Sequence, residues 1–136
     1  MNSKERTMKN ALLALAVVVA AQPVIVRAHH SFASEFDANQ PISLKGSVTK
    51  VEFINPHSWI HIEVTNADGS KAAWEVEGGT PNTLFRKGIN DNTLPVGTVI
   101  AVDGYRARDG SNRMSGRDIT LADGKKVFLS GSAPQD

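Results

Sequence analysis

Apolar and polar side chains alternate along several stretches of the chain, and this two-residue period is typical of half-buried β-strands. The clearest alternation covers residues 58–65, where one face carries Ile60, Ile62 and Val64 and the other carries Trp59, His61 and Glu63. A second alternating stretch covers residues 71–77, and the Asp68-Gly69 pair between the two predicts a hairpin turn. The pattern therefore predicts a β-hairpin with one apolar face.

Further strands are predicted on both sides of this hairpin. β-Branched and apolar residues indicate a long first strand over residues 41–54, with Gly46 suited to a bend and Asn55-Pro56 to the turn that follows. Thr80 and Pro81 are typical of the cap and first turn of a short helix. Later extended segments are expected at residues 98–102, 105–109, 117–121 and 125–129.

The predicted order is three strands, a short helix and then two or more strands. This is the order of the oligonucleotide/oligosaccharide-binding (OB) barrel, a small and partly open Greek-key barrel. We therefore predict an all-β, OB-like Greek-key barrel over residues 41–130, with one short helix between strands 3 and 4; a small β-sandwich is the second choice. Residues 29–40 are expected to be an extended segment and residues 131–136 a disordered tail.

The first 28 residues have the pattern of a secretory signal peptide. Lys4, Arg6 and Lys9 give a basic start, and residues 11–21 form an uninterrupted apolar run. A run of this length fits the apolar region of a signal peptide and is short for a membrane span. We therefore expect no membrane span in the processed protein.

The small side chain of Ala28 and the short one of Val26 suit recognition by a signal peptidase, so cleavage is predicted after Ala28. Cleavage nearer Ala21 and an uncleaved anchor are the alternatives, and Met8 could be the true start. Cleavage after Ala28 predicts a protein of the bacterial periplasm or of the outside.

The amino-acid composition excludes several kinds of functional site. The chain has 136 residues and no cysteine, which excludes a disulfide framework, a thiolate metal site and a cysteine nucleophile. Loss of residues 1–28 removes four basic residues and one acidic residue, which changes the formal net charge from +1 to −2. A slightly acidic mature chain argues against a nucleic-acid partner.

The positions of the histidines are the most informative chemical feature. Cleavage after Ala28 would place His29 at the new N-terminus, where its α-amine and a ring nitrogen can chelate one metal ion, with His30 beside it. Cu(II) prefers such tetragonal nitrogen sets, and His57 or His61 could complete this one. The alternative is a solvated N-terminal end that binds nothing.

His57 and His61 cannot both bind one ion if they lie on one straight strand, because four residues then span about 13 Å. They could do so only if His57 belongs to the preceding turn and folds back. Otherwise His57 is expected to be a turn residue bonded to backbone, and His61 a half-exposed strand residue beside Glu63.

The other candidate functional residues give weaker signals. Three large aromatic residues are expected in the core, and two of them, Trp59 and Tyr105, are also candidates for an exposed ligand or protein contact. Glu75 and Glu77 share a strand face, but two carboxylates alone do not define a glycosidase. A mixed-charge surface is expected around residues 103–118, with the arginines Arg106, Arg108, Arg113 and Arg117.

Residues 29–32 (HHSF) and 55–59 (NPHSW) are short motifs with an unusual composition. Together with residues 104–107 (GYRA), they resemble a family of small exported bacterial proteins that is classed as a domain of unknown function. The resemblance covers nearly all of residues 28–129, with a departure at residues 113–116. It implies export and a small β-barrel-like fold, and it implies no activity or catalytic residues.

We therefore expect an exported periplasmic binding protein, not an enzyme, whose histidines hold Cu(II) or another transition metal. The second hypothesis is an accessory module that binds a protein or a small periplasmic ligand on its barrel face. Metal binding requires that His29 approach His57 or His61. An interaction module instead requires an exposed apolar patch near Trp59 or Tyr105.

Overall fold

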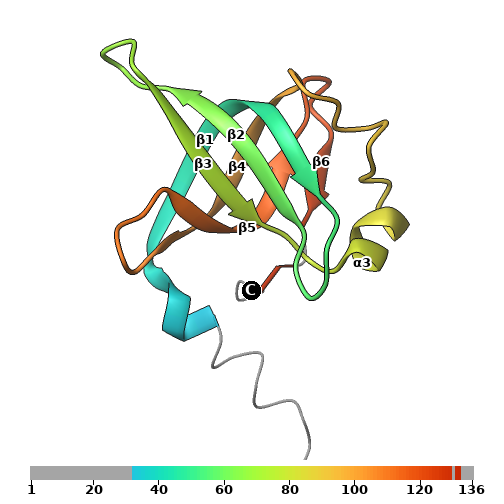
Figure 1. The fold of residues 1–136 in the computed structure, drawn as a ribbon, viewed down its shortest axis with the longest axis horizontal. Coiled ribbons are helices and arrows are strands. Elements are labelled where there is room, and N and C mark those ends of the chain that lie inside the picture. The colour runs from blue at the N-terminus through green and yellow to red at the C-terminus, as the bar shows by residue number, and fades with distance from the viewer. Residues whose placement is uncertain (1–31, 130, 133–136) are drawn as a thin grey trace, which may run out of the picture.

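Six strands and one short helix make up the fold, in a computed structural model that describes residues 32–129 and 131–132 (Figure 1). A helical turn at residues 32–35 leads into the first strand. The elements are β1 (Phe36–Glu52), β2 (Trp59–Thr65), β3 (Lys71–Glu77), α3 (Pro81–Arg86), β4 (Val99–Ala107), β5 (Arg113–Thr120) and β6 (Lys126–Phe128). The predicted order of three strands, a helix and further strands is confirmed.

The strand pairing closes the sheet into a ring. The long strand β1 pairs antiparallel with β2 through its second half and with β4 mainly through its first half. β2 pairs with β3, and β4 pairs with β5, again antiparallel. β3 and β5 then meet in parallel through residues 75–77 and 113–115. This is the connectivity of an OB barrel, so the predicted fold class is confirmed.

The inward faces of the strands fill the barrel as the alternation predicts. Ile60, Ile62 and Val76 are fully buried. The helix α3 packs against this core through Leu84, which is also fully buried. Thr80 caps the helix, because its side-chain oxygen accepts a hydrogen bond from the backbone N–H of Thr83.

Two strand glycines allow neighbouring backbones to approach closely. Gly46 is the point at which β1 pairs with β2 and β4 at once, and a Cβ there would lie 2.7 Å from the carbonyl oxygen of Glu63. Gly104 lies at a register shift between β4 and β5, and a Cβ there would lie 2.1 Å from the carbonyl oxygen of Ser115. Both positions therefore require glycine.

Two strands begin earlier than the sequence predicts. β1 starts at Phe36 rather than at residue 41, because the Phe36 ring is buried and its backbone pairs with Ala107 across a register shift. β5 starts at Arg113 rather than at residue 117, because its first residues pair with β3. The alternation is lost there, since Met114 and the next two residues are all buried.

The structure describes the chain from residue 32 and, near its other end, residues 131–132. The predicted signal peptide, its cleavage site, His29 and His30 lie outside the described residues. At the other end, Ser132 is still tied to the barrel, because its backbone N–H donates to Glu77 Oε1 at 3.3 Å. No helix in the described part of the chain is long and apolar enough to cross a membrane.

Candidate functional site

The outer surface at the closure of the barrel carries a row of polar side chains. Trp59 lies opposite Glu77, and His61 lies opposite Glu75, in the pairing of β2 with β3. The parallel pairing of β3 with β5 places Arg113 opposite Glu75. Because alternate residues of a strand point to the same face, these side chains converge where the ring of strands closes.

Glu77 is a buried carboxylate at the end of β3, with only 3% of the residue exposed. Its Oε1 accepts the hydrogen bond from the Ser132 backbone and lies 3.2 Å from Nδ1 of His57. Burial of a carboxylate is costly unless hydrogen-bond donors or positive charges face it. The Ser132 N–H and the His57 ring are the groups that face the Glu77 carboxylate. Glu77 is on the same strand face as Glu75, but it is buried because other segments cover this end of β3.

His57 lies in the loop between β1 and β2, as the turn signal predicts, and its side chain is 35% exposed. The buried Nδ1 faces Glu77 but lies outside hydrogen-bond geometry, so it has no hydrogen-bond partner among the described residues. The opposite nitrogen, Nε2, makes no contact with a described polar group either. Nδ1 of His57 thus lies beside a carboxylate without a hydrogen bond to it, and Nε2 is left without a polar contact to the described residues.

His61 has a different environment, because it lies between two carboxylates. Its Nε2 is 2.6 Å from Glu52 Oε2, and its Nδ1 is 3.9 Å from Glu75 Oε1. Hydrogen bonds from Lys50 and then from His61 hold the pKa of Glu52 below its ordinary value. Both ring nitrogens of His61 thus face carboxylates, and a metal could reach Nε2 only by displacing Glu52.

Arg113 covers Trp59, with its guanidinium carbon 4.8 Å from the centre of the indole. It also lies 3.4 Å from a Glu75 oxygen and 3.8 Å from a Glu35 oxygen. The face of Trp59 is therefore occupied by a cation–π contact. The neighbouring arginines are engaged as well: Arg106 over the Trp74 ring, Arg108 at the Phe36 carbonyl and Arg117 at Asp118.

A pocket of about 240 Å³ opens beside His57. Its lining consists of Glu35, Phe36, His57, Trp59, Glu77, Arg113 and Ser132. The pocket therefore joins the β1–β2 loop to the beginning of β1 and to the return of the chain after β6. Within the described residues, no group of three histidine and carboxylate side chains is arranged to hold a metal ion.

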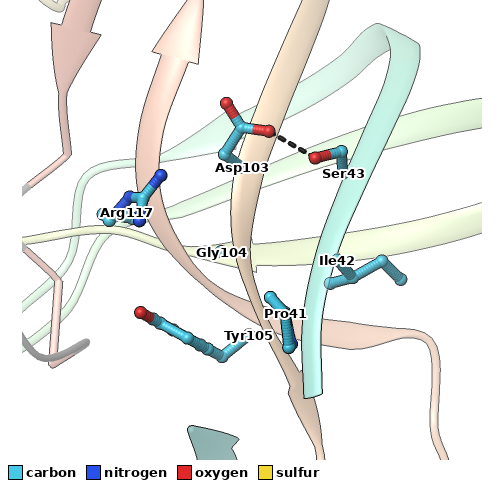
Figure 2. A pocket seen from close by; sticks show the side chains of 7 residues that line it. All are labelled: Pro41, Ile42, Ser43, Asp103, Gly104, Tyr105 and Arg117. Carbon is cyan, nitrogen blue, oxygen red and sulfur yellow. Dashed lines mark hydrogen bonds between the residues drawn. The ribbon is translucent and has the colours of Figure 1, made fainter. Parts of the chain in front are cut away.

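Tyr105 belongs to a different pocket of about 280 Å³, which lies on β1, β4 and β5 (Figure 2). It is lined by Pro41, Ile42, Ser43, Asp103, Gly104, Tyr105 and Arg117. The Ser43 hydroxyl donates a hydrogen bond to the Asp103 carboxylate, with 2.5 Å between the oxygens. Figure 2 shows the two side chains facing each other. The Tyr105 ring also packs edge-on against Phe32, with 5.7 Å between ring centres. Trp59 and Tyr105 therefore line separate pockets.

Sequence reasoning identified His57, His61, Trp59 and Tyr105 but did not single out Arg113 as a residue of the pocket. Arg113 looks like one member of a solvated charged turn, because only the β3–β5 pairing brings it to Trp59. No local sequence signal reveals that contact.

The strand pairing and the pocket at the ring closure define a small OB-type barrel that carries histidine and carboxylate side chains on its β2–β3 face. Residues 15–116 match the family of unknown function DUF6152, and the chain belongs to this family. The family membership predicted from the short motifs is thereby confirmed. No curated protein matches the chain.

Among solved structures, the chain is similar to the N-terminal domain of the PriB protein from Thermoanaerobacter tencongensis, whose structure is described as dimeric. The TM-score is 0.42 and the sequence identity 25%, and the match covers 62% of this chain and 97% of that one. The assignment of the OB fold rests on the strand pairing of this chain.

Proposed function

We propose that the mature protein is an exported, non-enzymatic binding protein that holds one Cu(II) ion, or a related transition-metal ion, between His29 and His57. The environment of His57 carries this proposal. Its Nδ1 lies 3.2 Å from the buried carboxylate of Glu77, and its Nε2 has no polar contact with the described residues, beside a pocket. A carboxylate behind a histidine orients the ring and raises the basicity of the nitrogen that binds the metal.

The first described residues lie close to this pocket, which supports the proposal. Glu35 and Phe36 line the pocket themselves, and Phe32 is held against Phe36 with 5.8 Å between the ring centres. His29 precedes Phe32 by three residues, so it can extend at most about 10 Å from that anchor. This short tether, together with the position of Phe36 in the pocket lining, supports a site shared by His29 and His57.

The ligand chemistry suits Cu(II). An α-amine with a pKa of about 7.7–8.0 and an imidazole with a pKa of about 6.5 lose their protons to a metal at low cost near neutral pH. The α-amine and the ring of His29 would supply two nitrogens, and His57 the third, in the tetragonal arrangement that Cu(II) prefers. His30 offers a further ring nitrogen next to this set.

Export and metal binding are coupled in this proposal. The α-amine of His29 becomes available only after cleavage behind Ala28, so the unprocessed chain lacks one ligand. The signal-peptide pattern supports export to the periplasm or the outside, where cleavage takes place. Copper would accordingly bind the processed protein and not its cytoplasmic precursor.

The test is a copper titration of protein that has been exported and cleaved by the cell, with the N-terminus verified by intact mass. A chelator of known affinity competes for the metal. A matched variant carries three extra alanines before His29, which separates both N-terminal histidines from the α-amine and leaves no histidine among the first three residues, where it could form a chelate with the terminus. We expect one equivalent of Cu(II) to bind the native terminus at least about tenfold more tightly than the extended one.

Three substitutions locate the second ligand. His57→Ala should weaken binding as strongly as the three added alanines, and Glu77→Gln should weaken it about 10- to 100-fold, the usual effect of removing a carboxylate behind a ligand. His61→Ala is the matched control and should leave the affinity unchanged. Weak and equal binding by the native and extended termini would refute the proposed function.

An exposed apolar contact favours a second candidate, an interaction module. Ile54 and Phe85 are 51% and 46% exposed, and the rings of Phe53 and Phe85 lie 4.8 Å apart. If copper does not bind, a pull-down from periplasmic extract with the native protein and with Phe85→Ser tests this alternative. Equal capture by both would exclude a partner that docks at this contact.

A further inference from the structure

The pocket that contains Tyr105 lies on the outer face of β1, β4 and β5, separate from the pocket of His57 (Figure 2). The antiparallel register of β1 and β4 sets Ser43 opposite Asp103. Two residues earlier in β1, Pro41 lies opposite Tyr105. Because alternate residues of a strand share a face, these two cross-strand pairs lie next to each other on one surface. Figure 2 shows the first pair at one end of the pocket and the second pair at the other, so one end is polar and the other is largely apolar.

A β-bulge in β5 brings Arg117 to this pocket. The residues on either side of it, Gly116 and Asp118, pair with the neighbouring residues Gly104 and Asp103 of β4. Arg117 is therefore the extra residue of the bulge. Bulges of this kind re-aim a side chain and often lie next to active sites. The side chain of Arg117 lines the pocket, so the irregularity of the strand adds a guanidinium to the polar end.

The charged groups at the polar end neutralise one another. Asp118 Oδ2 lies 3.0 Å from Arg117 Nε, and Asp118 Oδ1 lies 2.8 Å from Nζ of Lys126 on β6. The same Lys126 nitrogen lies 3.8 Å from Asp103 Oδ2. Two carboxylates and two cationic groups carry no net charge together. An ionic ligand would therefore lose its hydration without gaining a net electrostatic attraction.

The same groups can bind a neutral ligand that both donates and accepts hydrogen bonds. An ionised carboxylate has about four lone-pair sites, and Asp103 accepts one hydrogen bond from the Ser43 hydroxyl, so it can accept further donors. A hydrogen bond to Asp118 chiefly, and Tyr105 to a lesser degree, raise the pKa of the Arg117 guanidinium. The Tyr105 side chain thus lies beside a fixed positive charge, and the two supply donors next to the acceptor Asp103.

We propose that this pocket binds the ring of a neutral sugar, at a second site that is independent of the proposed copper site. Sugar hydroxyls donate to Asp103 and accept from Arg117, and the C–H face of the ring packs against Pro41 and Tyr105. A volume of about 280 Å³ is at the lower end of ligand pockets and suits one sugar ring. OB barrels bind ligands on the face of strands 2 and 3, whereas this pocket lies on β1, β4 and β5.

The test is an NMR titration of the metal-free, processed protein with four neutral sugars: glucose, galactose, mannose and N-acetylglucosamine. Glucuronate and glucosamine are the charged counterparts, used at about pH 6, where the carboxylate and the amine are ionised. We expect at least one neutral sugar to bind with a dissociation constant of about 1 mM, because a ligand of this size gains little binding free energy. The amides of residues 42–43, 103–105 and 117 should shift, and those of His57 and Trp59 should not.

Two conservative substitutions test the polar end of the pocket. Asp103→Asn can still accept from Ser43, but it should weaken binding of the neutral sugar about tenfold, because a charged acceptor is lost. It also leaves the group of charges positive, so glucuronate should gain affinity relative to the neutral sugar. Arg117→Lys keeps the charge but removes the planar fork, and it should likewise weaken sugar binding about tenfold.

Glu63→Gln is the matched control, because Glu63 also carries a carboxylate on an outer face, 2.6 Å from Lys71, but lies outside this pocket. It should leave sugar binding unchanged. The proposal would be overturned if none of the four neutral sugars gave saturable shifts, or if the shifts lay outside the pocket. Tighter binding of either charged sugar by the native protein would overturn it, and so would equal affinities for Asp103→Asn and Glu63→Gln. None of these results depends on copper, so the two proposed sites stand or fall separately.

Discussion

Substitution of Gly104 by alanine tests the close contact between β4 and β5 on which the closed barrel depends. The new Cβ would lie 2.1 Å from the Ser115 carbonyl oxygen and 2.8 Å from Cε of Met114. Ordinary carbon–oxygen contacts begin at about 3.3 Å, so the backbones of β4 and β5 would have to separate by about 1 Å. The Met114 side chain can move aside, whereas the Ser115 backbone is held in the sheet.

Overpacking of this kind costs about 1–3 kcal/mol where side chains can yield, and more where backbone must move. We therefore expect Gly104→Ala to lower the free energy of unfolding by about 3 kcal/mol or more, and Tm by at least about 12 °C for a domain of this size. Gly69→Ala is the matched control. Gly69 has φ +84° and nothing within 4 Å of a new Cβ, so only the cost of a left-handed alanine remains, about 1–2 kcal/mol.

Urea unfolding of the mature protein, followed by the fluorescence of Trp59 and the buried Trp74, measures both variants. The slope of the free energy against urea should stay at its native value, because the unfolded chain and the fold are unchanged. If Gly104→Ala costs no more than Gly69→Ala at a native slope, the close approach of β4 and β5 is refuted.

Two further outcomes test the core and its charges. Burial of the Asp118 carboxyl opposes ionisation, but hydrogen bonds from Lys126 and Arg117 outweigh it and hold its pKa below the ordinary value. The stability that this ionised carboxylate contributes is present above about pH 4 and is lost as the pH falls through its lowered pKa. The unfolding free energies of the native protein and of Asp118→Asn should therefore converge at low pH. A difference that stays constant with pH would contradict this expectation. Leu84→Ala should cost about 2–5 kcal/mol in urea unfolding, since Leu84 is fully buried, and a smaller loss would show that α3 does not pack on the core.

The sequence was sufficient to predict the elements whose signals are local. The alternation over residues 58–65 identified the buried face of β2, and Thr80 with Pro81 identified the start of α3. The order of these elements then led to the OB barrel. The predicted strand bounds were less accurate in two places. At the start of β5, consecutive residues are buried and the two-residue alternation is absent. At the start of β1, the buried ring of Phe36 extends the strand beyond the predicted residues.

The candidate site was predicted only in part. The sequence identified all four histidines as candidate metal ligands, but it could not show that His57 is a better candidate than His61. The structure distinguishes them, because both ring nitrogens of His61 face carboxylates, whereas only Nδ1 of His57 faces one among the described residues. His29 and His30 stay predictions, since they lie outside the described residues.

The sequence by itself determined the faces of the strands, the place of the helix and the class of fold, because periodicity and capping are properties of neighbouring residues. Only the tertiary structure decided that Glu77 is buried behind His57 and that Arg113 covers Trp59. Those contacts arise when β3 meets β5 and when Ser132 returns to the barrel. Segments far apart in the chain create them, so no local pattern encodes them.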